Sequence, residues 1–230
     1  MLAARPHLEP RRDAHASTVR VNEIYVSLQG ESAHAGKLCT FIRLTGCHLR
    51  CTYCDSRFSF YEGDKRRIED VVAEVVRLKA PMVEVTGGEP LLQPGVYPLM
   101  DALLKEGLTV LLETSGSIDV RLVPQAVHRI VDWKTPSSGE ADRNELKCFD
   151  SMTERDELKF VIGSRQDYDW VKDVIARYGL AKKPFGLLYS SVYGKVGNDA
   201  LAQWLIDDRM PGRFQLQQHK YVWPPDARGV

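Results

Sequence analysis

Short apolar segments recur along this chain, and polar segments with helical periodicity separate several of them. Residues 39–45 alternate with a period of two and are rich in β-branched side chains, which predicts a strand. Residues 21–26 predict a shorter strand before it. Six further apolar runs predict strands at residues 82–86, 109–114, 129–134, 158–162, 185–189 and 214–217.

Helical periodicity is clear in three of the intervening segments. Ile68, Val71, Val72, Val75 and Val76 follow helical spacing, and residues 168–178 and 199–208 have similar patterns. Alternating strands and helices predict a mostly parallel sheet with outer helices. A closed eight-unit TIM barrel needs about 250 residues, so we expect an α/β fold of the shortened, open (partial) TIM-barrel type. Residues 21–230 are expected to form a single domain after a flexible N-terminal tail, residues 1–20.

Polar motifs follow five of the predicted strands. They occupy residues 46–56, 86–90, 113–117, 132–139 and 189–195. In folds of this class the chemistry takes place at the carboxyl ends of the strands. We therefore expect these five segments to converge on one opening.

Composition and charge exclude several classes of protein. The chain has 230 residues, of which 43% are hydrophobic and 27% charged, which is typical of a globular protein. Lys plus Arg and Asp plus Glu both number 31, and this balance argues against non-specific binding of nucleic acid. No apolar run reaches the roughly 18 residues of a membrane span, and the start lacks a secretory signal. No targeting signal argues against a cytoplasmic location.

Three of the five cysteines form a compact motif. Cys47, Cys51 and Cys54 have the spacing C-x3-C-x2-C, whereas Cys39 and Cys148 stand apart and are expected to be packed or surface thiols. An odd, sparse set argues against a disulfide framework. Zinc sites normally have four protein ligands, and electron-transfer clusters usually have four cysteines. Three thiolates favour a 4Fe–4S cluster with one iron open to another ligand, with a zinc site or unliganded buried thiols as the alternatives.

The cysteine motif, with Tyr53 before its last cysteine, resembles that of the radical S-adenosylmethionine (SAM) enzymes. From about residue 22 onward, the chain is similar to the family of 7-carboxy-7-deazaguanine synthases. The segments that carry this similarity are VSLQGES, FIRLTGC, CTYCDS, VEVTGGEP, LETSGS, DWKTPSSG, LKFVI and QHKYVW. The resemblance implies a carbon–nitrogen lyase of queuosine and 7-deazapurine biosynthesis. It would convert 6-carboxy-5,6,7,8-tetrahydropterin to 7-carboxy-7-deazaguanine, with loss of ammonia, by a radical ring contraction that uses SAM.

The resemblance also implies a set of binding residues. The residues expected to contact SAM are Tyr53, Cys54, Asp55, Gly88, Glu89, Asp132, Trp133, Lys134, Ser190, Ser191, Val192 and Tyr193. Glu89 would help hold the SAM amino group. Ser56 stands where many members have Thr, and its hydroxyl is expected to bind Mg²⁺.

The substrate-binding residues implied in the same way are Leu28, Gln29, Gly30, Glu31, Arg43, Thr86 and Pro225. Arg43 shares a strand face with Phe41 and Thr45, and its guanidinium could hold the substrate carboxylate with two hydrogen bonds. His219 and Lys220 are expected to be structural.

Partners follow from the same resemblance. A flavodoxin or ferredoxin is expected as reductant, and the chain is expected to form a homodimer that binds neither nucleic acid nor membrane. Two alternatives remain: another small radical SAM enzyme such as a glycyl-radical activase, or a metal-binding module without catalytic activity.

Overall fold

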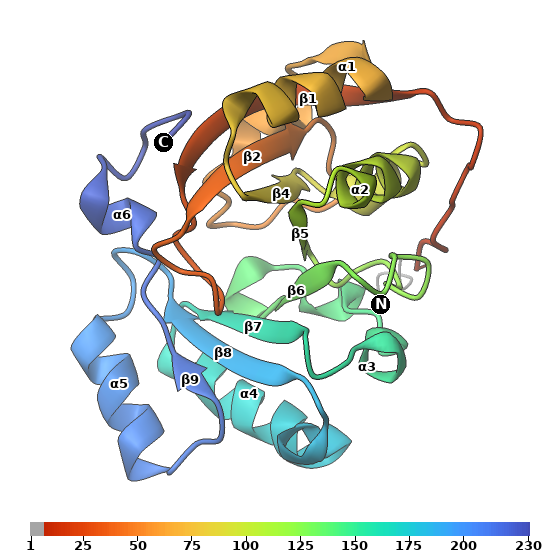
Figure 1. The fold of residues 1–230 in the computed structure, drawn as a ribbon. Coiled ribbons are helices and arrows are strands. Elements are labelled where there is room, and N and C mark those ends of the chain that lie inside the picture. Colours follow the sequence, from red (N-terminus) through yellow and green to blue (C-terminus); the bar gives the residue numbers. More distant parts are fainter. Residues whose placement is uncertain (1–6) are drawn as a thin grey trace.

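A computed structural model describes residues 7–230, and its strands form one nine-stranded sheet (Figure 1). The strand order is β3-β1-β2-β4-β5-β6-β7-β8-β9. β1 pairs antiparallel with β2 and β3, and the pairs from β2 to β9 are parallel. The strands are β1 Thr18–Leu28, β2 Leu38–Leu44, β3 Asp64–Arg67, β4 Met82–Gly87, β5 Thr109–Thr114, β6 His128–Trp133, β7 Glu157–Ile162, β8 Gly186–Ser191 and β9 Arg213–Phe214.

This sheet is open, with β3 and β9 at its two edges, and it confirms the expected α/β fold of the partial TIM-barrel type. Most strand boundaries differ from the predicted ones by one to three residues. β1 is longer than predicted because it pairs with both β2 and β3. It begins at Thr18, so residues 18–20, which we expected in the N-terminal tail, belong to the sheet. Residues 1–6 of the expected tail lie outside the described residues.

Helices cover the outer face of the sheet (Figure 1). They are α1 Ile68–Leu78, α2 Val96–Lys105, α3 Cys148–Ser151, α4 Arg165–Tyr178, α5 Asn198–Asp207 and α6 His219–Val222. α1 buries Ile68, Val71, Val72 and Val75, as its periodicity predicts. α4 begins three residues before the predicted start because the Ser164 hydroxyl accepts the Asp167 amide and caps the helix. Sequence periodicity did not reveal α2.

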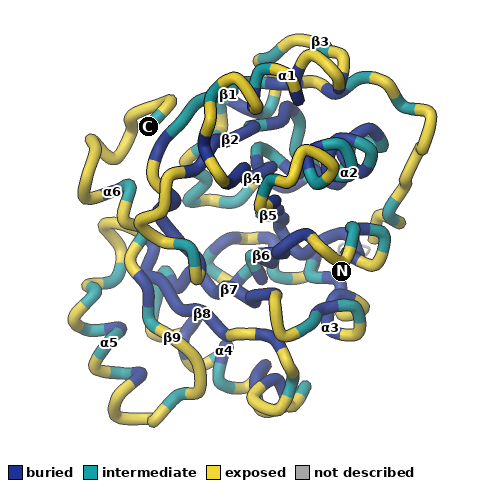
Figure 2. The backbone as a smooth tube through the Cα atoms, in the orientation of Figure 1, coloured by how far each residue is buried: buried dark blue, intermediate teal, exposed yellow. Residues whose placement is uncertain are grey.

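Successive side chains of each strand point to opposite faces of the sheet. The middle strands are buried throughout, whereas the outward turns of the helices and the C-terminal segment are exposed (Figure 2). Val83 and Val85 of β4 face the helices and belong to the larger apolar core. The inner face carries a smaller apolar cluster, Cys39, Phe41, Met82, Leu111 and Ile130. The inner positions nearer the carboxyl ends of β4 to β7 are mostly charged or polar, and they form the floor of the site described next.

Candidate active site

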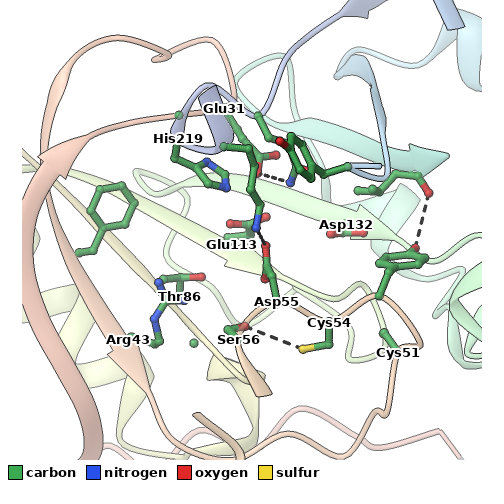
Figure 3. Close-up of a pocket in the computed structure, with 18 of the residues that line it drawn as sticks. Glu31, Arg43, Cys51, Cys54, Asp55, Ser56, Thr86, Glu113, Asp132 and His219 are labelled. Carbon is green, nitrogen blue, oxygen red and sulfur yellow. Dashed lines mark hydrogen bonds and ion pairs between the residues drawn. The ribbon is translucent and has the colours of Figure 1, made fainter. Parts of the chain in front are cut away.

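A cavity of about 520 Å³ opens at the carboxyl ends of the parallel strands. Residues from all five of the polar segments predicted to converge there line it, which confirms that prediction. The β1–β2 connection and residues 217–230 complete the wall. Figure 3 shows that Glu31, Arg43, Thr86, Glu113, Asp132 and His219 surround one space beside the loop that carries Cys51, Cys54, Asp55 and Ser56.

The cysteine loop leaves β2 at Gly46, whose positive φ of 100° suits glycine. Cys47, Cys51 and Cys54 all line the cavity as free thiols. Arg50 Nη1 donates to the Cys47 carbonyl (2.8 Å), and the Thr52 amide donates to the Ser138 carbonyl (3.0 Å). Burial raises the pKa of Cys47 to about 12 and that of Cys51 to about 11. Metal binding by these thiols therefore releases protons.

The donor set fits an iron–sulfur cluster with one open position. Three thiols from one loop face a common cavity, whereas Cys39 and Cys148 are buried in the apolar packing, as expected. Within residues 7–230, no three His, Cys, Asp or Glu side chains are grouped tightly enough to hold a single metal ion.

The turn after β4 packs directly against the cysteine loop. A Cβ at Gly88 would lie 2.2 Å from the Gly46 carbonyl oxygen and 2.9 Å from the Cys47 Cβ. The Glu89 amide also donates to the Gly46 carbonyl (2.8 Å). Only glycine permits this approach, so Gly88 lies beside the first cysteine at the cavity wall.

Most residues expected to contact SAM line the cavity. They are Tyr53, Cys54, Asp55, Gly88, Asp132, Lys134, Val192 and Tyr193. Lys134 Nζ lies 3.1 Å from Asp132 Oδ1. Burial acts to lower the pKa of Lys134, but the Asp132 carboxylate raises it above the usual value. Lys134 is therefore a buried cation that is paired at the cavity wall.

Three of the expected SAM contacts, Trp133, Ser190 and Ser191, do not line the cavity. The Trp133 side chain stacks on Phe149 at 4.4 Å in the outer core, so the indole does not face the cavity. The Ser191 hydroxyl donates to Asn198 Oδ1 (2.6 Å) at the start of α5. Because side chains alternate along a strand, Trp133 and Ser191 point outward when Asp132 and Ser190 point inward. Ser190 is buried and does not line the cavity.

Glu89 also lies behind the cavity wall rather than in it. Its side chain is fully buried (0% exposed). Oε1 accepts the Leu91 amide (3.0 Å) and the Thr114 hydroxyl (2.7 Å), and Oε2 accepts the Ser115 amide (2.8 Å) and hydroxyl. Thr114 and Ser115, which hold the Glu89 carboxylate, line the cavity, whereas Glu89 itself does not.

All seven residues expected to contact the substrate line the cavity: Leu28, Gln29, Gly30, Glu31, Arg43, Thr86 and Pro225. Arg43 Nε donates to Glu23 (2.7 Å) and Nη2 donates to the Tyr25 hydroxyl (2.8 Å). Its Nη1 donates to no residue in the described part of the chain. The guanidinium is thus held on one edge and keeps donor capacity for a ligand.

Lys159 is the centre of a buried charged layer on the cavity floor. Its side chain is 2% exposed, and Nζ contacts Glu31 (2.8 Å), Glu113 and Asp132 (3.5 Å). Burial would lower the pKa of Lys159, but the three carboxylates raise it well above the usual value. Burial would raise the pKa of Glu31, but the Lys159 charge lowers it.

Glu84 has the opposite character in the same layer. Burial, followed by repulsion from Glu113, raises the pKa of Glu84 well above that of an ordinary carboxyl group. Gln29 Nε2 donates to its Oε2, and the Gln29 side-chain carbonyl accepts the Glu31 amide (2.9 Å). Glu84 therefore keeps its proton at a higher pH than usual and can both donate and accept hydrogen bonds.

Sequence reasoning did not single out Glu84, Glu113 or Lys159. Each is a charged residue inside a largely apolar run, and each occupies an inner position. That pattern is a usable signal because buried charges are rarely retained without a partner or a function. Lys220, which we expected to be structural, lines the cavity and donates to Asp55 (2.6 Å), and His219 lines it as well.

Helices of the described residues include none that is long and apolar enough to cross a bilayer. A model of the radical SAM superfamily matches residues 41–136. The chain is 44% identical to a 7-carboxy-7-deazaguanine synthase from Chlorobaculum tepidum over 215 residues, which cover 92% of this chain and 97% of that relative. It is 41% identical to one from Koribacter versatilis, covering 92% of this chain and all of that relative. The crystal structure of QueE from Escherichia coli has a similar fold, with a TM-score of 0.73, 24% identity, and coverage of 88% of this chain and 95% of that one.

Proposed function

This chain belongs to the 7-carboxy-7-deazaguanine synthase family of radical SAM enzymes, and we propose that it catalyses the reaction after which the family is named. The substrate would be 6-carboxy-5,6,7,8-tetrahydropterin, and the products 7-carboxy-7-deazaguanine and ammonia. The observation that carries the proposal is that three free cysteines and Arg43 line the same cavity. The relatives' names do not favour a glycyl-radical activase.

Membership of the radical SAM superfamily implies a 4Fe–4S cluster and SAM. Cys47, Cys51 and Cys54 would hold the cluster, and Gly88 allows the β4 turn to lie against it. When bound, the cluster and SAM supply the one-electron chemistry that removes a hydrogen atom from the substrate. The protein's own contribution is to position the two ligands and to exclude water. Val192 and Tyr193 offer apolar surface to the adenosyl group at the cavity wall.

Arg43 is assigned to the substrate carboxylate. Glu23 and Tyr25 hold one edge of the guanidinium, which limits its freedom before the ligand arrives. A pterin ring carries amino and N–H donors along one edge and a carbonyl acceptor. Gln29 and, in its protonated form, Glu84 can satisfy both kinds of group from the cavity floor. The Gln29 side chain is held at both ends, by Glu84 and by the Glu31 amide.

Mg²⁺ is proposed at Ser56. This side chain lines the cavity, with its hydroxyl 3.9 Å from Cys54 Sγ. A serine oxygen, water and the substrate carboxylate are the hard oxygen ligands that Mg²⁺ prefers. The cation would orient the carboxylate and stabilise negative charge during the rearrangement.

Partners and location extend the same proposal. A flavodoxin or ferredoxin would supply the electron, the chain would act as a homodimer, and the reaction would take place in the cytoplasm. A reducing compartment suits three free thiols that face a cavity.

Turnover under anaerobic conditions tests the proposal. The cluster-loaded protein, given dithionite, SAM, Mg²⁺ and the carboxytetrahydropterin, is expected to form the deazapurine and ammonia in equal amounts. The Arg43→Lys variant should raise the KM for the pterin about 10- to 100-fold, because a charge-assisted hydrogen bond contributes about 1.5–3 kcal/mol. Its SAM affinity should be unchanged. The matched control is Arg165→Lys, an exposed arginine on α4, which should behave as wild type.

Two results would contradict this assignment. If cluster-loaded protein cleaves SAM but forms no deazapurine, the substrate is wrong. If Arg43→Lys and Arg165→Lys have the same KM for the pterin, Arg43 does not hold the carboxylate.

A further inference from the structure

Three exposed arginines surround the segment that carries the cysteines, residues 46–63. They are Arg20, Arg50 and Arg57, and we call them the arginine face. Each guanidinium donates to backbone carbonyls of this segment. Tyr61 joins two of them, because its carbonyl accepts from Arg20 (3.0 Å) and its hydroxyl is 3.2 Å from Arg50 Nη2. Within residues 7–230, none of the three arginines forms an ion pair with a carboxylate.

Two of these side chains are held beside the expected cluster ligands. Arg50 Nη1 donates to the Cys47 carbonyl (2.8 Å). Arg57 Nη2 donates to the carbonyl of Thr52 (2.6 Å), the residue after Cys51. Positive charge is therefore fixed close to two of the three thiols.

The cysteine loop separates this charge from the cavity. Cys47, Cys51 and Cys54 line the cavity, whereas no member of the arginine face does. The arginine charges therefore do not serve a ligand in the cavity, and they face solvent on the other side of the thiols.

The two acidic residues of the same segment do not cancel these charges. Asp55 pairs with Lys220 (2.6 Å), and Glu62 pairs with Arg228 (3.1 Å). Both carboxylates are thus compensated by cations of the C-terminal segment. The three guanidinium charges, in contrast, are compensated only by carbonyl dipoles.

The flanking residues leave this surface positive. Residues 136–139, which pack against the cysteine loop through the hydrogen bond from Thr52 to Ser138, are uncharged. Lys65 balances Asp64, and Asp142 adds one exposed negative charge. Since the whole chain has no net charge, the arginine face is a local positive surface.

The proposed function requires an electron to reach the cluster from outside the protein. A protein donor cannot enter a cavity of about 520 Å³, which SAM and the substrate would also occupy. It therefore has to approach the thiols from their other side, where the arginine face lies. Opposite charges on two surfaces steer their encounter. Nucleic-acid complexes with about 6–10 phosphate contacts need a broader basic surface than three arginines.

We propose that the arginine face is the docking surface for an acidic one-electron carrier protein. This inference rests on the proposed function, because it requires a reducible cluster behind the loop. In the docked complex one electron leaves the carrier and enters the cluster, so the carrier is oxidised by one electron and the cluster reduced by one. No covalent bond forms or breaks, and no residue of the arginine face gains or loses a proton.

The test compares Arg57→Glu with Arg57→Lys, which keeps the charge. The matched control is Arg177→Glu: Arg177 is exposed in the last turn of α4, which ends near the amino end of β8, away from the cavity. The probe is a flavodoxin of net negative charge in its hydroquinone form. Stopped-flow absorption follows semiquinone formation with anaerobic, cluster-loaded protein, and reduced methyl viologen serves as a small reductant that needs no docking. Calorimetry measures the Kd of the oxidised flavodoxin.

At low salt, Arg57→Glu should be reduced by flavodoxin about 10-fold more slowly than wild type, and its Kd should rise by a similar factor. Arg57→Lys should stay within about threefold of wild type, and Arg177→Glu should match it. Reduction by methyl viologen should not be slowed in any variant. In about 1 M salt, where charges are screened beyond about 3 Å, the difference between Arg57→Glu and wild type should nearly disappear.

Three results would overturn the inference. The first is equal reduction by flavodoxin in Arg57→Glu and Arg177→Glu. The second is a loss that is the same for both reductants with an unchanged Kd, which would indicate a structural role. The third is tRNA binding by the wild type that Arg57→Glu abolishes, which would assign the surface to nucleic acid.

A second variant applies if Arg57→Glu does not retain iron. Arg20 lies on β1 and donates to the Tyr61 and Gly63 carbonyls, apart from the cysteines. Arg20→Glu should show the same loss of about 10-fold with flavodoxin, and a wild-type rate would refute the inference. Failure of the proposed function is distinguishable: flavodoxin would then reduce the cluster with the expected dependence on Arg57, but no deazapurine would form.

Discussion

Replacing Lys159 by methionine tests whether the charged layer on the cavity floor is held together by a single cation. Lys159 lies 2% exposed between Glu31, Glu113 and Asp132. Methionine has a similar length and fills the same apolar path, but it removes the charge and all three contacts. Removing one partner of a buried ion pair costs about 3–5 kcal/mol, because an uncompensated charge remains.

The structure places the expected loss at the lower end of that range. Asp132 keeps the ion pair with Lys134 (3.1 Å), and Glu31 keeps the hydrogen bond from Gln217 (2.9 Å). Glu113 loses its ion-pair partner. We therefore expect Lys159→Met to lower the free energy of unfolding by about 3 kcal/mol at pH 8.

The loss should depend on pH with a defined sign. Burial already raises the pKa of Glu113 above its ordinary value, and loss of the Lys159 charge would raise it further. A carboxyl group whose pKa is higher in the folded state binds more protons folded than unfolded. Its contribution to stability therefore falls as the pH rises from the unfolded pKa towards the folded pKa. The difference between variant and wild type should be at least about 1 kcal/mol smaller at pH 5.5 than at pH 8.

Urea unfolding of anaerobic, cluster-loaded protein, followed by circular dichroism at both pH values, measures this difference. The matched control is Lys172→Met, since Lys172 pairs with Asp208 at 2.6 Å while 37% exposed. An exposed pair contributes less than about 1 kcal/mol. Equal losses for the two variants, or a Lys159→Met loss that does not change with pH, would refute the reasoning.

Three further predictions concern the metal sites and the sheet. A colorimetric iron assay should show that Cys51→Ala loses most of its cluster iron. The control Cys148→Ala, at a buried cysteine outside the motif, should retain its iron and lose only about 1–2 kcal/mol of folding stability. Equal iron loss in the two variants would contradict the assignment of Cys51 as a cluster ligand. Ser56→Ala should abolish the stimulation of turnover by added Mg²⁺ and Ser56→Thr should retain it, so a normal Mg²⁺ response in the alanine variant would exclude Ser56 as a ligand. Trp133→Phe should lower the free energy of unfolding by about 2 kcal/mol, because the indole packs in the outer core. SAM affinity should stay unchanged, and weaker SAM binding in cluster-loaded protein would contradict the observed orientation of Trp133.

Apolar runs in the sequence predicted the strands well where a strand is buried on both of its faces. The runs that became β4, β5 and β7 are continuous apolar segments with one charged residue each, and their boundaries were close to those observed. Of the run predicted at residues 214–217, only Phe214 lies in a strand, the two-residue β9, which pairs with Leu188 and Tyr189 alone. Pairing length is a property of the neighbouring strand, which the run itself does not contain.

Functional residues were predicted best where they lie close together in one short segment of the sequence. The spacing of Cys47, Cys51 and Cys54 was sufficient to place three thiols in one loop, and the structure turns all three to the cavity. Each segment predicted to contact SAM contributes residues to the cavity wall, but not every predicted side chain faces the cavity. Resemblance identifies a turn such as residues 132–134, and the pleat of the strand then decides that Asp132 faces inward and Trp133 outward.

The amino-acid sequence by itself determined the order of eight of the nine strands and of three helices, the cysteine loop and the polar segments at the strand ends, since each depends on neighbours within a few residues. Tertiary structure alone decided which strand face became the inside of the barrel, and it brought together residues such as Lys159 and Glu31, 128 positions apart, and Lys220 and Asp55, 165 apart. The physical reason is that a period-two pattern separates the two faces of a strand without saying which is inner. That choice is made when the helices bury one face and the buried charges of the other find their partners.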